Sequence, residues 1–348
     1  MKIAIVGAGW YGCHLATFLK QIGFEVAIFD RSTSVFSGAS GKNQNRLHLG
    51  FHYARDYTTR FQSRDGFSRF TERYPHLSSP ISSNLYAVPK GTSLIDFRTY
   101  KAIMASSGIE FEDIDMNRPN VKMVSNISGI VNTHERVVET SKAATFFGNS
   151  LSNILRLNTQ VALSDIATFD DRVEVFGESF DYLIDATWGK LTPLDIQVFY
   201  EPTLLLYYRS KVADWALTMV DGPLCSIYPT DNPEIITLSS VPHTPLGRFD
   251  NIAAAESFVR SIDDAMIAHK RSLFEAQIEE YLPAFKDLFS YEGPQISMKT
   301  KPIGAEDNRA CYVFRHGRTF SVMSGKIDTI FIAAERIISS IGRLDEQN

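Results

Sequence analysis

The sequence predicts an α/β fold that opens with a dinucleotide-binding unit and continues into a second unit of α+β type. The first observation is a short apolar run, Ile3–Val6, followed at once by the pattern G-x-G-x-x-G at residues 7–12. The second is another apolar run, Phe24–Phe29, that ends in Asp30. A buried strand, a glycine turn, a helix and an acidic strand end are together typical of dinucleotide binding. The third is an alternation of apolar residues between about 198 and 246, which indicates a mainly antiparallel sheet.

Length and composition exclude several classes of protein. The 348 residues, 44% of them hydrophobic, are enough for about two domains. Charges are nearly balanced, 35 basic against 40 acidic, which argues against nucleic-acid binding over the whole surface. Three widely spaced cysteines fit neither a disulfide framework nor a zinc site, and no apolar run suits a membrane helix. Glycines interrupt the opening apolar run too early for a signal peptide. From these observations together we expect a soluble, cytoplasmic protein that binds no metal.

Each glycine of the opening turn has its own task. The first permits the tight turn, the second lets the backbone approach a pyrophosphate, and the third lets the helix pack on the strand. The carboxylate of Asp30 can accept hydrogen bonds from ribose hydroxyls and disfavours a 2′-phosphate, which argues against NADP. A glycine turn without a dinucleotide is the alternative. We expect contacts to the dinucleotide from Gly7, Ala8, Gly9, Trp10, Tyr11, Gly12, Asp30 and Arg31.

Three segments far apart in the chain indicate which dinucleotide is bound. The first is GASGKNQNRLHLGFHYAR at residues 38–55, the second FDYLIDATWG at 180–189, and the third FSVMSGKIDT at 320–329. Together they resemble the D-amino-acid oxidase-like family of FAD-dependent oxidoreductases, which includes glycine and sarcosine oxidases. The resemblance covers about half of the chain.

This resemblance implies non-covalent FAD in a Rossmann domain of the glutathione-reductase type, built from residues 1–78, 133–200 and 296–348. Residues 79–132 and 201–295 would then form the substrate domain. In the family, the first segment runs along the pyrophosphate and flavin, the second ends a strand at the FAD, and the third closes a turn under the flavin. Further FAD contacts are therefore expected from Ser40, Asn43, Gln44, Asn45, Arg46, Leu47, Val161, Ala186, Thr187, Trp188, Gly189, Ser324, Gly325, Lys326 and Ile327.

A physical argument supports the third segment independently. Ser324 and Gly325 stand where a strand passes into a helix. A helix N-terminus carries about half a positive charge and unpaired N–H groups. These groups, from Gly325, Lys326 and Ile327, would face the part of the flavin where negative charge collects on reduction. An ordinary helix cap by Ser324 is the alternative, and the two are compatible.

Histidines and an aromatic residue follow the expected FAD contacts. His48, His52 and Tyr53 would face the substrate side, although one or both histidines could equally be hydrogen-bonded core residues. Histidines four residues apart without the H-E-x-x-H pattern do not indicate a metal site. We treat His48 and His52 as catalytic candidates.

The substrate-binding residues are expected from later segments. Family members that act on amino acids hold the carboxylate with an arginine before a proline and with a tyrosine from the substrate sheet. Here Lys301 precedes the proline, and a lysine offers a point charge instead of a bidentate fork. This departure puts a free α-amino acid in doubt. Arg309 and Arg315 could substitute, and the tyrosine candidates are Tyr207, Tyr208 and Tyr228, of which we favour Tyr207 and Tyr228.

The segment from Arg55 to Arg73 looks helical and contains five arginines against three acidic residues. A solvated helix face is the ordinary explanation of such a segment. The alternative is a stripe that binds phosphates, so nucleic acid remains a possible partner through Arg55–Arg73. One long helical stretch is also expected from about Ile252 to Tyr281.

The leading functional hypothesis is FAD-dependent oxidation of a C–N bond in an amine or glycine-like N-substituent, with O₂ or another acceptor reoxidising the flavin. The same chemistry on a carrier-attached substrate, such as an amino-acid-modified base in DNA or tRNA, is one alternative. Oxidation of a sugar or amino sugar in surface-polysaccharide synthesis is another, and a non-catalytic flavin-binding module is the last. The oligomeric state stays open.

Overall fold

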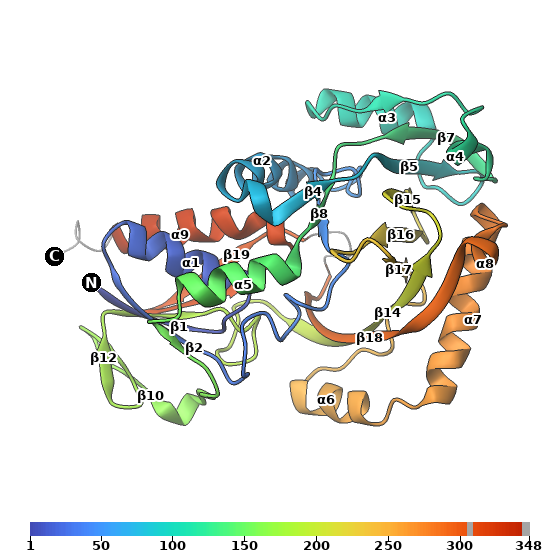
Figure 1. Cartoon of the computed structure of the whole chain (residues 1–348). Helices are drawn as coiled ribbons and strands as arrows, with labels where there is room; N and C mark the ends of the chain where they lie inside the picture. The colour runs from blue at the N-terminus through green and yellow to red at the C-terminus, as the bar shows by residue number, and fades with distance from the viewer. Residues whose placement is uncertain (305–308, 343–348) are drawn as a thin grey trace. The chain divides into compact units, whose positions relative to one another are not determined.

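Figure 1 shows the computed structural model, which describes residues 1–304 and 309–342. The chain divides into two units of interleaved segments. Unit 1 comprises Met1–Gly41, Thr140–Phe199 and Thr300–Asn348, and unit 2 comprises Lys42–Glu139 and Tyr200–Lys299. The mixed α/β architecture with a discontinuous Rossmann unit agrees with the fold class that the sequence predicts.

A six-stranded sheet with the order β19-β20-β13-β1-β2-β9 forms the centre of unit 1. Its strands from β20 to β9 run parallel, and β19 is antiparallel to β20. The apolar runs that predict strands are the buried centre of this sheet, as expected where both faces are covered. The bounds are β1 Lys2–Val6, β2 Glu25–Phe29, β9 Leu155–Arg156, β13 Tyr182–Asp185, β19 Tyr312–His316 and β20 Thr319–Met323.

Within the described residues, three helices and a small sheet complete unit 1 (Figure 1). Helix α1 directly follows the glycine turn and packs on β2 and on α9. The small antiparallel sheet β10-β11-β12 shares an apolar cluster with β1 and β2, to which Phe29 and Phe180 belong. The bounds are α1 Trp10–Gln21, α5 Thr140–Ser150, α9 Ile330–Gly342, β10 Ile166–Thr168, β11 Val173–Val175 and β12 Glu178–Phe180, with short 3₁₀ turns at Leu163–Asp165 and Ile327–Thr329.

Unit 2 contains an eight-stranded sheet with the order β18-β14-β17-β16-β15-β5-β7-β6. The pairs from β14 to β15 and from β5 to β6 are antiparallel, whereas β15 and β5 run parallel, so the sheet is mixed. The bounds are β5 Ser83–Pro89, β6 Glu112–Asp113, β7 Ile127–Asn132, β14 Val198–Ser210, β15 Trp215–Met219, β16 Cys225–Pro229, β17 Ile235–Ser240 and β18 Phe289–Pro302.

The helices of unit 2 include α7, which packs on β16 and β17 through Phe274 and Ile278. The sequence predicts one helical stretch here, but this prediction is wrong in detail. Residues 261–263 separate two helices, because the Asp263 side chain accepts a hydrogen bond from Met266 N at 2.8 Å and so caps the second. The bounds are α2 Tyr57–Arg73, α3 Phe97–Ser106, α4 Pro119–Lys122, α6 Ile252–Arg260, α7 Asp264–Tyr281 and α8 Phe285–Leu288, with a 3₁₀ turn at Pro75–Leu77.

A small sheet within unit 2 has the order β3-β8-β4. Its strands are Arg46–Leu47, Arg136–Val138 and Ser78–Pro80, and both pairs are antiparallel. These pairings join residues 42–78 and 133–139 to unit 2, whereas the sequence assigns both stretches to the FAD domain. The boundaries drawn by the fold therefore differ from the expected ones, although the order of alternating segments is the same.

A search of the described residues for a helix long and apolar enough to cross a membrane finds none.

Candidate functional site

The glycine turn after β1 is held by close backbone contacts within unit 1. Gly7 has φ +107°, and a Cβ atom there would lie 2.8 Å from the carbonyl oxygen of Ala186. A Cβ atom on Gly12 would lie 1.8 Å from the carbonyl oxygen of Gly7, so the start of α1 packs against the turn at glycine distance. These positions therefore require glycine for the reasons that the G-x-G-x-x-G pattern predicts.

The N-terminus of α1 is suited to an anionic group. Gly9 is its N-cap and offers no side-chain cap, while Trp10 N donates to Ser40 Oγ at 3.0 Å. Unpaired N–H groups and the helix dipole make such an end a site for phosphate. Ser40 thereby joins the polar segment of residues 38–55 to the turn. Its contact with the pyrophosphate stays a prediction.

Asp30, at the end of β2, fixes the turn from its other side. Its carboxylate accepts hydrogen bonds from Ala8 N at 2.7 Å and Ser32 N at 2.8 Å. A carboxylate has about four acceptor positions, so capacity for ribose hydroxyls remains. Arg31 follows directly and is exposed, and Val161 is buried in the apolar cluster of β1 and β2.

The A-T-W-G segment follows β13 and is ordered by a buried carboxylate. Asp185 accepts from Thr187 N at 2.8 Å, from Thr187 Oγ1 at 2.6 Å and from Thr192 N at 2.8 Å. Trp188 and Gly189 then adopt φ values of +66° and +72°. Trp188 Nε1 is buried and has no hydrogen-bond partner within the described residues, so it is a donor available to a ligand.

The turn after β20 lies next to this segment in unit 1. A Cβ atom on Gly325 would lie 3.8 Å from the Trp188 ring and 3.7 Å from Arg309. The hydroxyl of Tyr11 donates to the Lys326 carbonyl at 2.7 Å, and burial raises the pKa of that hydroxyl well above its ordinary value. The helix expected here begins as the 3₁₀ turn at Ile327 and becomes α9 at Ile330.

These features of unit 1 fit FAD. The glycine turn and the α1 N-terminus suit the pyrophosphate, and Asp30 suits the ribose. Trp188 Nε1 is a buried donor without a protein partner, and the Ser324–Ile327 turn adjoins it. The chemistry that FAD would supply is the acceptance of two electrons from a substrate.

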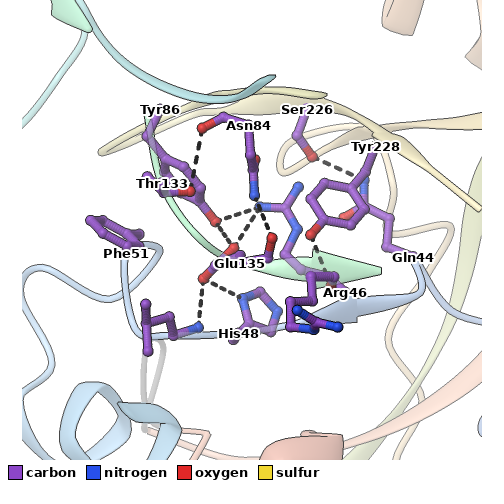
Figure 2. A network of polar contacts seen from close by, with 12 residues as sticks. Gln44, Arg46, His48, Phe51, Asn84, Tyr86, Thr133, Glu135, Ser226 and Tyr228 are labelled. Atoms are coloured by element: carbon purple, nitrogen blue, oxygen red, sulfur yellow. Dashed lines mark hydrogen bonds and ion pairs between the residues drawn. The ribbon is translucent and has the colours of Figure 1, made fainter. Parts of the chain in front are cut away.

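Unit 2 contains a buried polar cluster centred on Glu135 (Figure 2). The side chains of Arg46 and Glu135 are 1% and 0% exposed, with Arg46 Nη1 3.9 Å from Glu135 Oε2. Tyr86 bridges them: Arg46 Nη1 donates to its hydroxyl at 2.6 Å, and that hydroxyl donates to Glu135 Oε2 at 2.5 Å. Burial raises the pKa of Tyr86, so its hydroxyl keeps the proton that it donates.

Arg46 is held in its charged form by these neighbours. Burial alone would lower its pKa, but Tyr86, Tyr228 and Glu135 outweigh burial and raise it. Its guanidinium also lies over the Tyr228 ring, 4.0 Å from the ring centre, in a cation–π contact. The sequence assigns Arg46 to the FAD, and the structure surrounds it with tyrosines and a glutamate of unit 2.

His48 lies on the other side of Glu135. Its Nδ1 atom is 3.7 Å from Glu135 Oε1, and Leu49 N donates to the same oxygen at 2.8 Å. The rings of His48, His52 and Tyr53 are mutually close, with centroids 5.4 to 5.7 Å apart. The two histidines that the sequence singles out therefore form one aromatic group with Tyr53, and His48 also approaches a carboxylate.

The expected tyrosines both belong to the eight-stranded sheet. Tyr228 is fully buried, and its hydroxyl donates to the Arg136 carbonyl at 3.1 Å. Tyr207 donates to Gln295 Oε1, and Gln295 Nε2 donates to the Asn43 carbonyl at 3.3 Å. Tyr208 contacts Glu275 instead.

The remaining expected residues of the segment 38–55, and Lys301, lie in different parts of the structure. Gln44 Nε2 donates to Ser226 Oγ at 2.9 Å and to Ser239 Oγ at 3.0 Å. Asn45 and Leu47 are buried in unit 2, where β3 pairs with β8. Lys301 is half-buried near the end of β18 and belongs to unit 1. The structure therefore brings Gln44 and Arg46 together with Tyr228, but Lys301 clusters with another unit.

The arginines of α2 and its approach have acceptors inside the chain. Arg55 Nε binds Asp221 at 2.7 and 2.9 Å, and Arg60 donates to Ser107 and to the carbonyls of Tyr53 and Ala54. Arg64 donates to the Ser107 carbonyl, and Arg69 pairs with Asp65. Four of the five arginines of Arg55–Arg73 thus have acceptors within the protein and Arg60 is buried, which differs from the solvated helix face that the sequence suggests. Phosphate binding by this segment stays a prediction.

Sequence reasoning misses Glu135, Tyr86, Asn84 and Thr218. Glu135 stands in the segment THERVV, where nothing marks a buried carboxylate, and the other three are single polar residues in apolar strands. A polar residue inside a strand run is the one available signal, because an isolated buried polar group requires partners.

The chain was compared with known proteins. The family described as FAD dependent oxidoreductase matches residues 2–326. The FAD-dependent monooxygenase FPY4 of Fusarium mangiferae is 52% identical over 98% of this chain and 91% of its own length. The FAD-dependent monooxygenase kojA of Aspergillus flavus is 27% identical over 98% of this chain and 86% of its own.

Solved structures share the fold at low identity. The glycine oxidase of Geobacillus kaustophilus matches with a TM-score of 0.71 and 14% identity, over 98% of this chain and 94% of its own. The L-α-glycerophosphate oxidase of Mycoplasma pneumoniae, solved with FAD bound, matches with a TM-score of 0.72 and 13% identity, over 96% and 92%. The glycine turn, Asp30 and the Ser324–Ile327 turn of unit 1 fit FAD, and the family matches residues 2–326. The chain therefore belongs to the family of FAD dependent oxidoreductases.

Proposed function

We propose that the chain oxidises the C–N bond of an amine to an imine, which water then hydrolyses to an amine and a carbonyl product. The C–H bond beside nitrogen breaks with its electron pair, the C=N bond forms, and nitrogen releases one proton. Bound FAD, held by the unit 1 residues described above, supplies the two-electron acceptor. The chain's own residues have to bind the substrate and take the proton.

The observation that carries this proposal is His48 beside the buried Glu135, 3.7 Å from Nδ1 to Oε1. The carboxylate favours a proton on Nδ1, which leaves the lone pair on Nε2 to accept a proton from a substrate ammonium. His48 keeps 19% of its side chain exposed, so it is accessible to a substrate. We assign His48 as the base and Glu135 as its positioning residue.

A second candidate is monooxygenation, and the relative with 52% identity favours it through its name. In that reaction one atom of O₂ enters the product, the other becomes water, and a reductant supplies two electrons.

A substrate attached to a nucleic acid is a narrower version of the amine proposal. The internal contacts of Arg55, Arg60 and Arg64 do not support it.

Anaerobic bleaching of the flavin absorbance of the purified holoenzyme tests the main proposal. The panel contains amino acids, N-methyl and N-carboxymethyl amines, amino sugars, and glycine-modified nucleosides both free and within oligonucleotides. Bleaching by a small amine supports amine oxidation, whereas bleaching only by the oligonucleotide makes the substrate carrier-attached. No bleaching, combined with ¹⁸O from ¹⁸O₂ in a product formed with NADH, would replace the proposal by monooxygenation.

The role of His48 has a matched control in this chain. His134 also lies near a carboxylate, 3.9 Å from Glu112, but both side chains are more than half exposed. We expect His48→Gln to slow anaerobic reduction at pH 7 about 100-fold and His134→Gln to leave it unchanged. Equal rates for the two variants would remove His48 as the base.

A further inference from the structure

One face of the eight-stranded sheet in unit 2 is polar although it is buried. Tyr86, Thr218, Ser226 and Ser239 are register partners across four neighbouring strands, so their side chains share this face. Leu85, Leu217, Ile227 and Leu238 form the adjacent row, point to the opposite face and belong to the apolar core with α7. Tyr86, Thr218 and Ser226 are buried and Ser239 is half-buried, and buried hydroxyls of this kind are normally hydrogen-bonded.

Several polar atoms on this face, or on Arg46 of the neighbouring strand β3, have no partner in the described part of the chain. They are Thr218 Oγ1, Asn84 Oδ1, and Nε and Nη2 of Arg46, and all four are buried. Asn84 lies two residues before Tyr86 on the same face, and Arg46 contacts the Tyr86 hydroxyl (Figure 2). Leaving such groups unpaired costs free energy, so their concentration around one tyrosine requires an explanation.

The geometry points to a binding site for a neutral, oxygen-rich group, with neighbouring hydroxyl or carbonyl oxygens as in a sugar. We propose that this group binds around Tyr86. Arg46 Nε and Nη2 lie on one edge of the guanidinium and donate in parallel, which suits two adjacent oxygens. Asn84 Oδ1 would accept a hydrogen bond from a ligand hydroxyl, and Thr218 Oγ1 could either donate or accept one. The inference rests on the proposed function for one point only: the oxidised amine would belong to an amino-sugar-like substrate.

The charges at this site favour a neutral ligand over a carboxylate. The positive charge of Arg46 is already opposed by Glu135, 3.9 Å away and fully buried. A carboxylate on the open edge of Arg46 would place a second negative charge near the first among buried side chains, where an unpaired charge is costly. A neutral group with several oxygens satisfies the same atoms without that penalty.

Binding of glucose, as a neutral probe, to the holoenzyme by calorimetry tests the inference directly. We expect Thr218→Val to weaken glucose binding about tenfold, because one ligand hydrogen bond is lost. Thr203→Val is the matched control: this buried threonine of β14 already pairs with Ser297 Oγ at 2.9 Å, so glucose affinity should not change. Equal effects of the two variants, or no glucose binding, would overturn the inference.

Arg46→Lys distinguishes substrate from cofactor. It keeps the charge and removes the parallel donors, so we expect glucose affinity to fall about 100-fold at unchanged FAD content. Loss of FAD with unchanged glucose affinity would assign Arg46 to the cofactor and overturn the proposal, and so would Arg46-dependent binding of acetate in place of glucose. Glucose binding that responds to Thr218→Val, in an enzyme whose flavin no amine bleaches, would retain this site and reject amine oxidation.

Discussion

Asp185 of unit 1 and Glu135 of unit 2 are both buried, but the hydrogen-bond partners of the two carboxylates lie at very different distances along the chain. Asp185 of unit 1 bonds residues two to seven positions further along the chain. Glu135 of unit 2 bonds Tyr86 and Leu49, 49 and 86 positions away. The first therefore belongs to a local turn that a sequence motif can encode, whereas the second exists only when distant strands have assembled. Local motifs indicate the cofactor, whereas the polar cluster around Glu135 depends on long-range contacts.

Replacing Glu135 should produce the largest effect. Glu135→Gln leaves the buried charge of Arg46 unopposed, and we expect a loss of about 4 kcal/mol in the free energy of unfolding. Urea denaturation of the holoenzyme measures it. Restoration of most of this loss by Arg46→Met in the same chain is the expected control, since both charges are then absent. A loss under about 1 kcal/mol would mean that the pair is not buried as described.

Gly12→Ala comes next and addresses the local motif. The added Cβ would stand 1.8 Å from the Gly7 carbonyl oxygen, so the turn must shift. We expect a cost of about 3 kcal/mol and loss of bound FAD, read from the ratio of flavin to protein absorbance. Gly148→Ala is the matched control, because its Cβ would meet nothing closer than 4.0 Å in helix α5 and should stabilise slightly. Normal FAD content in Gly12→Ala would contradict the assignment of the turn.

Asp185→Asn should have an intermediate effect. An amide keeps one acceptor oxygen but puts an NH₂ group against the donors of Thr187 or Thr192, so about 2 kcal/mol should be lost. Because the contacts are local, FAD content should fall while glucose affinity in unit 2 stays unchanged. A fall in both would show that the two carboxylates do not act independently.

Replacing Glu178 should have the smallest effect on the free energy of unfolding, and this effect should depend on pH. Arg156 and Lys2 hold its pKa at about 2, below the ordinary value of 4.5. A lowered pKa contributes stability above pH 4.5, and that stability is lost as the pH falls towards 2. Its side chain is 30% exposed, so we expect Glu178→Gln to cost only about 1 kcal/mol at pH 7. The difference from wild type should shrink in urea denaturation at pH 3, and a constant difference would exclude the charge as its cause.

The sequence predicts much of unit 1, because its signals are short-range. The glycine turn, Asp30, the A-T-W-G segment and the closing turn lie where their motifs indicate. It does not predict that Asp263 divides the helical stretch, although aspartate is a preferred N-cap residue. Nor can it predict that Arg46 lies over Tyr228, because that contact depends on which strands become neighbours. The approach of His48 to Glu135 depends on long-range strand pairing in the same way, because these residues meet where β3 pairs with β8.

The interleaving of the two units has a consequence for synthesis on the ribosome. Strand β20, which lies beside β13 in the cofactor-binding sheet, comes from residues 319–323, and α9 comes later still. Unit 2 ends at Lys299, so its sheet can close while these pieces are still inside the ribosome. The nascent chain should therefore complete the sheet of unit 2 before it can complete the sheet of unit 1. Retention of FAD by unit 1 would then come at the last stage of biogenesis, after most of the chain has already left the ribosome.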